Sequence, residues 1–189
     1  TNDANDNSVC GAVDTSFGIT VDASANDYTT IPYTPLEVGE SYEGCVNYSD
    51  PYMPMYSYSG PVKGFEINLE ADKHYIFEAT VSRLNGTGEL EVEIDLFNDE
   101  LTGNFSEDLI DYYGEYNYSG NLNIAYPITV ETSGNYKVAF ECEIYDSEYG
   151  SIYGEDTYVK LTLREATVSE YNISTSEDLF EFYEDAEAG

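Results

Sequence analysis

Residues 90–97, LEVEIDLF, decide the fold class of this 189-residue chain. Apolar and acidic side chains alternate along this stretch, which is typical of a β-strand with one face toward a core. The chain repeats the pattern at short intervals, with Gly, Asn, Asp or Pro between the repeats. We predict further strands over residues 42–47, 62–69, 74–82, 122–130, 136–144 and 157–163.

Helical periodicity is weak throughout the chain. Residues 106–113 could form one helical turn, and residues 176–187 fit neither pattern clearly. Many short strands separated by turn residues predict an all-β fold, an antiparallel β-sandwich or jelly roll. We expect an N-terminal arm with one strand over residues 1–35, the sandwich over residues 36–164, and a C-terminal extension over residues 165–189.

The order of these segments resembles the bacterial and archaeal pre-peptidase C-terminal domain. The resemblance covers about residues 36–164 and is carried by residues 36–44 (LEVGESYEG), 64–77 (GFEINLEADKHYIF), 90–97, 133–138 (SGNYKV) and 158–163 (YVKLTL). Two departures stand out: a Tyr- and Pro-rich insertion over residues 50–59, and Asp72 where the family has Gly. The resemblance implies a compact accessory module that binds matrix polymers, sometimes with calcium.

Charge excludes several classes of partner. Six Lys and Arg stand against 38 Asp and Glu, for a net charge of −32. Nucleic acid is therefore not an expected partner, because phosphate binding needs clustered basic residues. Membrane insertion is not expected either, since no stretch approaches the roughly 20 apolar residues of a span. Salt, divalent cations or a basic partner must screen the carboxylates.

Calcium is the one cofactor that the sequence suggests, because carboxylate and carbonyl oxygens are its natural ligands. No EF-hand loop is present, so the ligands would come from separate loops. The candidate metal ligands are Asp95, Asp99, Asp146, Glu148 and Asp156. The other reading of these residues is a solvated acidic surface.

Catalytic residues are not predicted. The chain has a single histidine, His74, in a predicted turn, whereas Ser-His and Cys-His mechanisms need one beside the nucleophile. A pair of carboxylates could serve a glycosidase, but with 38 acidic residues no pair is singled out. We therefore expect a protein that is not an enzyme.

Cysteines and glycosylation sequons favour an extracellular or cell-surface location. Among Cys10, Cys45 and Cys142, we expect a disulfide between Cys10 and Cys45 and a buried thiol at Cys142, although Cys45 with Cys142 is also allowed. Because the chain begins at Thr1 without Met, we expect a processed, secreted form. Five Asn-x-Ser/Thr sequons are candidate glycosylation sites: Asn47, Asn85, Asn104, Asn117 and Asn172.

Twenty tyrosines, many of them in predicted loops, suggest a contact surface. The segment of residues 17–21 and the tail segment of residues 167–173 could each add to a sheet edge of a neighbouring subunit. The predicted interface residues are Phe17, Ile19, Val21, Tyr52, Tyr56, Tyr58, Tyr112 and Tyr113.

Two functions follow from these observations. The first is a secreted structural subunit that self-assembles, as a homo-oligomeric polymer, into an extracellular filament or surface coat with terminal strands crossing between subunits. The alternative is a monomeric accessory module that binds polysaccharide or matrix protein, with or without calcium.

Overall fold

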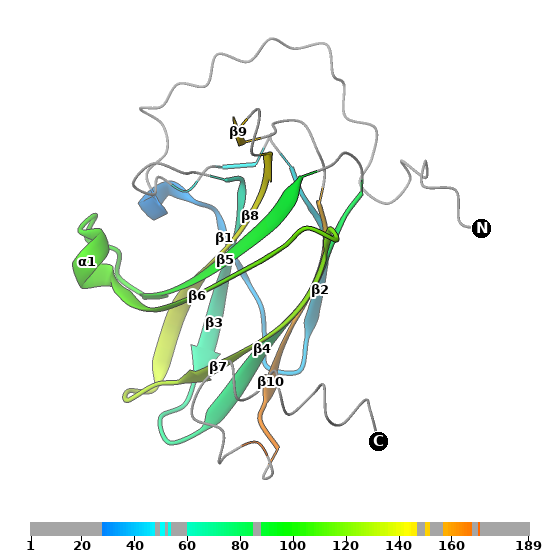
Figure 1. Ribbon diagram of the computed structural model, residues 1–189. Helices are drawn as coiled ribbons and strands as arrows, with labels where there is room; N and C mark the ends of the chain where they lie inside the picture. The colour runs from blue at the N-terminus through cyan, green and yellow to red at the C-terminus, as the bar shows by residue number, and fades with distance from the viewer. Residues whose placement is uncertain are drawn as a thin grey trace.

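The computed structural model describes residues 28–47, 50–51, 53, 60–84, 88–146, 150–151, 157–167 and 170. These residues form two β-sheets, A and B, that enclose one main apolar core (Figure 1). The predicted all-β sandwich is therefore confirmed.

Sheet A contains six strands in the order β1-β3-β8-β5-β6, with β9 pairing to β8. β1 runs parallel to β3, and the other pairs are antiparallel. The strands are β1 (Tyr33–Pro35), β3 (Val62–Leu69), β5 (Glu89–Asn98), β6 (Leu109–Asn117), β8 (Gly134–Asp146) and β9 (Gly150–Ser151).

Sheet B contains four strands in the order β2-β10-β4-β7, all antiparallel. They are β2 (Ser41–Val46), β4 (His74–Arg83), β7 (Asn121–Thr129) and β10 (Thr157–Glu165). β10 lies between β2 and β4, so sheet B is completed only when this late strand joins two early ones.

Alternation along each strand produces the core. In β5, Leu90, Val92 and Ile94 are fully buried between the sheets, and the residues between them turn to the outer face of sheet A. Phe77 of β4 and Phe140 of β8 meet across the core, with ring centroids 6.3 Å apart. Because side chains alternate between faces, burying the apolar set forces the acidic set outward.

A second apolar cluster covers one end of the outer face of sheet A. Its buried members are Tyr28, Ile31, Met53, Val62, Phe97 and Ala139. Tyr28 belongs to the short 3-10 helix η1 (Tyr28–Thr30), and its ring stacks on Phe97 with centroids 5.3 Å apart. Phe105, in the one-turn helix α1 (Phe105–Asp108) that Figure 1 shows beside β5 and β6, packs edge-on against both rings.

The seven strands predicted between residues 42 and 163 are all present, but β1, β6 and β9 were not predicted. The strand predicted for the N-terminal arm, residues 17–21, lies outside the described residues. The segment expected to form a helical turn does so only over residues 105–108 and then continues as β6. β1 belongs to sheet A, so the sandwich begins before residue 36. At the other end, β10 ends at Glu165, and Ala166 packs beside Ile76.

Cys45, in β2, is disulfide-bonded, and Cys142 is a buried free thiol. This arrangement excludes the pairing of Cys45 with Cys142. The predicted partner, Cys10, lies outside the described residues.

Among the described residues, no helix has the length and apolar character needed to cross a membrane.

Candidate functional site

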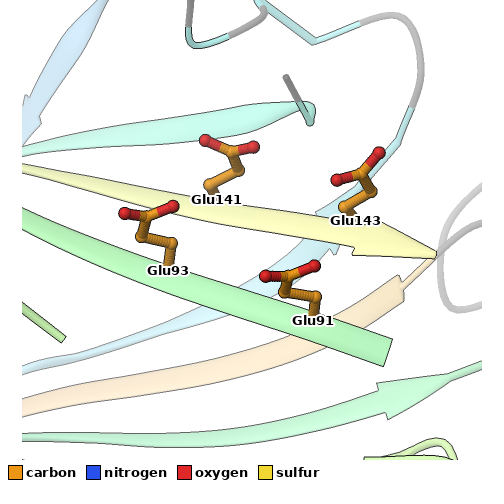
Figure 2. Close-up of a pocket in the computed structure, with 4 residues that line it drawn as sticks. All are labelled: Glu91, Glu93, Glu141 and Glu143. Carbon is orange, nitrogen blue, oxygen red and sulfur yellow. The ribbon is translucent and has the colours of Figure 1, made fainter. Parts of the chain in front are cut away.

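Acidic side chains gather on the outer face of sheet A, where β5 pairs with β8. Glu91 lies directly opposite Glu143, and Glu93 lies directly opposite Glu141. Directly paired residues of antiparallel strands point to the same face, with Cα atoms about 4.5–5.5 Å apart, and next-but-one residues of a strand lie about 6.6 Å apart. The four residues therefore form the corners of a small rectangle, here called the glutamate square (Figure 2).

The glutamate square lines a pocket. Figure 2 shows Glu91 and Glu93 on β5 and Glu141 and Glu143 on β8, all four rising from the same side of the two strands. The free volume between them is about 20 Å³. That volume suits one water molecule or one small ion, since one water needs about 10–15 Å³ measured in this way.

Burial within the glutamate square is uneven. Glu141 and Glu143 are each only 6% exposed, whereas Glu93 is half-buried and Glu91 is exposed. The Glu141 carboxylate accepts a 2.5 Å hydrogen bond from the Gly60 backbone N–H through Oε1, and Oε2 is buried without a hydrogen-bond partner. A buried carboxylate oxygen without a donor is costly, and either a proton or a ligand on this oxygen relieves that cost.

Burial and the neighbouring carboxyl groups raise the pKa values of Glu91, Glu93 and Glu141. Burial, opposed by the Gly60 hydrogen bond and reinforced by Glu93, Asp95 and Glu143, raises the pKa of Glu141 to about 9. Burial also raises the pKa values of Glu91 and Glu93, and neighbouring glutamates add to both shifts.

Asp95 extends the acidic row along β5. It is 1% exposed, its Oδ1 is buried without a hydrogen-bond partner, and burial together with the charge of Glu93 raises its pKa to about 8. The cause common to these shifts is that several carboxyls share a poorly solvated patch, which disfavours the charged forms.

Two exposed aromatic rings border the acidic row on β6. Tyr112 pairs with Asp95, Gly114 with Glu93, and Tyr116 with Glu91. Tyr112 is 64% exposed and Tyr116 is 63% exposed. A Cβ at Gly114 would meet no atom closer than the Val92 carbonyl oxygen at 4.0 Å, so the space between the two rings is open.

The predicted metal ligands fall in different places. Asp95 is in the acidic row, but Asp99 pairs with Lys137 at 2.7 Å. The side chain of Asp146 and all of Glu148 and Asp156 lie outside the described residues. Within the part of the chain that the structure describes, no three His, Cys, Asp or Glu side chains are already arranged as a metal centre.

The predicted interface residues do not lie on one common surface of the described structure. Tyr112 is exposed on the outer face, whereas Tyr113 turns toward the core, where its ring stacks on Tyr126 with centroids 5.8 Å apart. Phe17, Ile19, Val21, Tyr52, Tyr56 and Tyr58 lie outside the described residues.

Of the sequon asparagines, Asn104 is exposed at the start of α1, and its side chain makes no capping hydrogen bond. Asn47 is half-buried beyond β2, and Asn117 is half-buried at the end of β6, where its Oδ1 accepts from the Ser119 N–H. Asn85 and Asn172 lie outside the described residues.

His74 begins β4 in sheet B, where its Nδ1 lies 3.1 Å from the Thr129 hydroxyl. The glutamate square lies on sheet A and draws its residues from β5 and β8, so the histidine and the acidic pocket belong to different sheets.

The sequence indicated Asp95 as a candidate metal ligand but gave no prediction of the glutamate square. Glu91 and Glu93 alternate with apolar residues in one strand, and Glu141 and Glu143 do so in another, so the outward direction of each pair was readable. The pairing of β5 with β8, which brings the two pairs together, was not readable from the sequence.

No family model matches the chain, and no curated protein sequence is significantly similar to it. Similar solved structures include the pre-peptidase C-terminal domain of collagenase from Bacillus anthracis, at 11% identity and a TM-score of 0.39, covering 71% of this chain and 96% of that one. Another is described as "CBM4 structure and function", at 10% identity and a TM-score of 0.42, covering 67% and 78%.

A third is the C-terminal CBM6 of LamC, a marine laminarinase from Zobellia galactanivorans, at 14% identity and a TM-score of 0.31, covering 65% of this chain and 99% of that one. The Bacillus domain belongs to the family that the sequence resembles. At these identities and TM-scores, the matches assign no role to any residue of this chain.

Proposed function

We propose that this protein is an extracellular, non-catalytic module that binds a neutral polysaccharide on the outer face of sheet A. The observation that carries the proposal is the pair of exposed rings, Tyr112 and Tyr116, which stand on the same face of β6 with Gly114 between them. Exposed aromatic rings on one face of a sheet are suited to stacking on sugar rings, because tyrosine offers a large apolar face and a polar tip.

The spacing of the rings suits a polymer. Residues four apart in a strand are separated by roughly 13 Å at about 3.3 Å per residue, which is more than one sugar ring spans. The acidic side chains of β5 run alongside the rings and can accept hydrogen bonds from sugar hydroxyls.

Charge narrows the class of polymer. A chain of net charge −32, with acidic residues beside the proposed platform, repels polysaccharides that carry carboxylate or sulfate groups. A neutral glycan avoids that repulsion. The disulfide at Cys45 fits the oxidising environment outside the cell.

Affinity electrophoresis of the full chain in native gels tests the proposal, with hydroxyethyl cellulose as the neutral polymer and alginate as the anionic one. We expect hydroxyethyl cellulose to retard the wild type. Taking aromatic pairs as a guide, losing each ring costs about 0.5–1.5 kcal/mol, or roughly 2- to 12-fold in affinity.

The double variant Y112A/Y116A should therefore lose retardation, and Y112F/Y116F should keep it. Tyr158→Ala, on the opposite outer face in sheet B, is the matched control and should bind as the wild type does. Equal retardation of wild type and Y112A/Y116A, or no retardation of the wild type by the neutral polymer, would contradict the platform.

Self-assembly into a filament is a second candidate, and the position of β6 favours it. Among the described strands β6 pairs only with β5, so its other edge is not hydrogen-bonded to any described strand. Ile110 on this edge strand is 43% exposed. An extended segment of a second subunit can add to such an edge through main-chain hydrogen bonds.

The segments predicted to do so, residues 17–21 and 167–173, lie wholly or partly outside the described residues. Electron microscopy in the presence of salt or divalent cations is the test, because subunits of charge −32 repel one another in dilute buffer. Fibres that disappear on deletion of residues 1–30 would support assembly, and discrete particles under all conditions would contradict it.

A further inference from the structure

The geometry points to a calcium site at the glutamate square, in which Glu91, Glu93, Glu141 and Glu143 bind one Ca²⁺ between β5 and β8. This site differs from the ligand set that the sequence suggested. It is independent of polysaccharide binding by the tyrosines, so either proposal can fail without the other.

The first argument is the unbalanced charge of the pocket. Carboxyl groups directly opposite each other on paired strands repel when both are ionised, and the glutamate square contains two such pairs, Glu91 with Glu143 and Glu93 with Glu141. None of the ion pairs among the described residues involves Glu91, Glu93 or Glu141. A bound cation would convert this repulsion into attraction.

The second argument is the unused buried oxygen of Glu141. This residue is more than nine-tenths buried and lines the pocket, and its Oε2 has no hydrogen-bond partner although Oε1 is held by the Gly60 N–H. The Gly60 contact fixes one oxygen and leaves the other for a ligand. A carboxylate oxygen in this position requires a proton or a metal ion.

The third argument concerns the identity of the ion. The pocket is lined by carboxylates alone, and oxygen ligands suit calcium and magnesium better than zinc or copper. The nearest sulfur in the sequence, that of Cys142, belongs to the core between the sheets. Calcium accepts six to eight oxygens in irregular geometry, whereas magnesium demands a near-ideal octahedron and retains its waters.

The glutamates are not already closed around a centre, as the absence of a preformed metal group among the described residues shows. Glutamate side chains reach inward by rotation about their own bonds, while the paired strands hold their Cα atoms in place. Binding thus requires a change of rotamers and no change of fold.

The test measures thermal unfolding of the full chain after EDTA treatment, with CaCl₂, MgCl₂ and NaCl titrated at matched ionic strength. Screening alone raises the melting temperature equally with every salt. A site raises it with CaCl₂ at far lower concentration, because ligand binding to the folded state alone stabilises it by mass action. Terbium luminescence excited through tyrosine reports occupancy directly, since Tyr116 lies opposite Glu91.

The variants are E93Q/E141Q in the glutamate square and E100Q/E107Q as a matched control at exposed positions. Both replace two carboxyl groups with amides. We expect the control to respond to calcium as the wild type does. The site variant should need at least the roughly 10- to 100-fold more calcium that even loss of an outer-shell partner costs.

The proposal is overturned if CaCl₂ and NaCl act alike at matched ionic strength, or if E93Q/E141Q keeps the calcium response of the control. Equal action of MgCl₂ and CaCl₂ at low concentration would overturn the assignment to calcium. The single variant E93Q alters a half-buried residue, so it serves as the test if the double variant does not fold.

Discussion

Glu93 of β5 and Glu141 of β8 lie directly opposite each other on paired antiparallel strands, and both point to the outer face of sheet A. They point outward because the apolar residues that alternate with them along each strand point into the core. Two carboxylates in this relationship oppose folding unless something holds them together, so the pair links the stability of the sheet to its ionic surroundings.

Substituting Glu93→Gln should stabilise the protein in EDTA at low ionic strength above about pH 9, where Glu141, with its pKa raised to about 9, is ionised. The change removes one of two facing charges, and cross-strand pairs of this kind contribute about 0.2–1 kcal/mol to the free energy of unfolding. Urea unfolding followed by circular dichroism measures the gain, which should shrink as NaCl screens the repulsion. E100Q, at an exposed position, is the control, and its free energy of unfolding should stay close to that of the wild type. A lower free energy of unfolding in E93Q would contradict repulsion between Glu93 and Glu141.

Asp108→Asn should destabilise the protein at neutral pH and remove part of its acid sensitivity. Although burial opposes ionisation, hydrogen bonds from Tyr28, Thr102 and Gly103 outweigh it and hold the pKa of Asp108 below its usual value of 3.8. A lowered pKa contributes stability above the unfolded-state pKa, and this contribution is lost as the pH falls through the folded-state pKa.

The difference in unfolding free energy between wild type and D108N should therefore be largest near neutrality and should narrow below about pH 4. Unfolding in urea at a series of pH values measures it. Asp72→Asn, in an exposed turn with a positive φ that asparagine tolerates, is the matched control. If the difference in unfolding free energy between D108N and wild type is the same at every pH, ionisation of Asp108 does not contribute to stability.

Cys142 should be unreactive toward thiol reagents in the folded protein. Burial, aided by the negative charges of Glu141 and Asp50, raises the pKa of this thiol well above its ordinary value. The thiolate is the reactive form, so both access and ionisation oppose the reaction. In the absence of reductant, Ellman's reagent should detect no thiol in the folded protein and one thiol per chain after unfolding. Rapid reaction of the folded protein would contradict the buried position of Cys142.

Gly64→Ala should weaken the attachment of β1 to sheet A. A Cβ at this position would lie 2.8 Å from Cγ2 of Ile31 and 2.9 Å from the carbonyl oxygen of Pro32, closer than real contacts allow. Overpacking of this kind costs about 1–3 kcal/mol in unfolding free energy. Gly134→Ala, where the added Cβ meets nothing within 4 Å, is the matched control, and similar stability of both variants would contradict the close packing.

The strands that the sequence predicted are those with one clearly apolar face. β6 was missed because its residues 110–112 are all exposed, and its inward residues are Tyr113, Glu115 and Asn117, which do not read as a core face. β1 was missed because its three residues are held by pairing with β3, a contact between distant segments. Tyr113 was predicted in a contact surface because nothing in the sequence shows Tyr126 beneath it.

By itself, the sequence determined the all-β class, the positions of seven strands and the outward direction of the glutamates, because side-chain alternation is a local property of an extended chain. Only the tertiary structure decided which strands became neighbours. β5 and β8 are separated by the whole of α1, β6 and β7, yet they pair and bring four carboxylates around one pocket. The long-range pairing of strands follows from packing two apolar faces together, and that is a property of the whole chain.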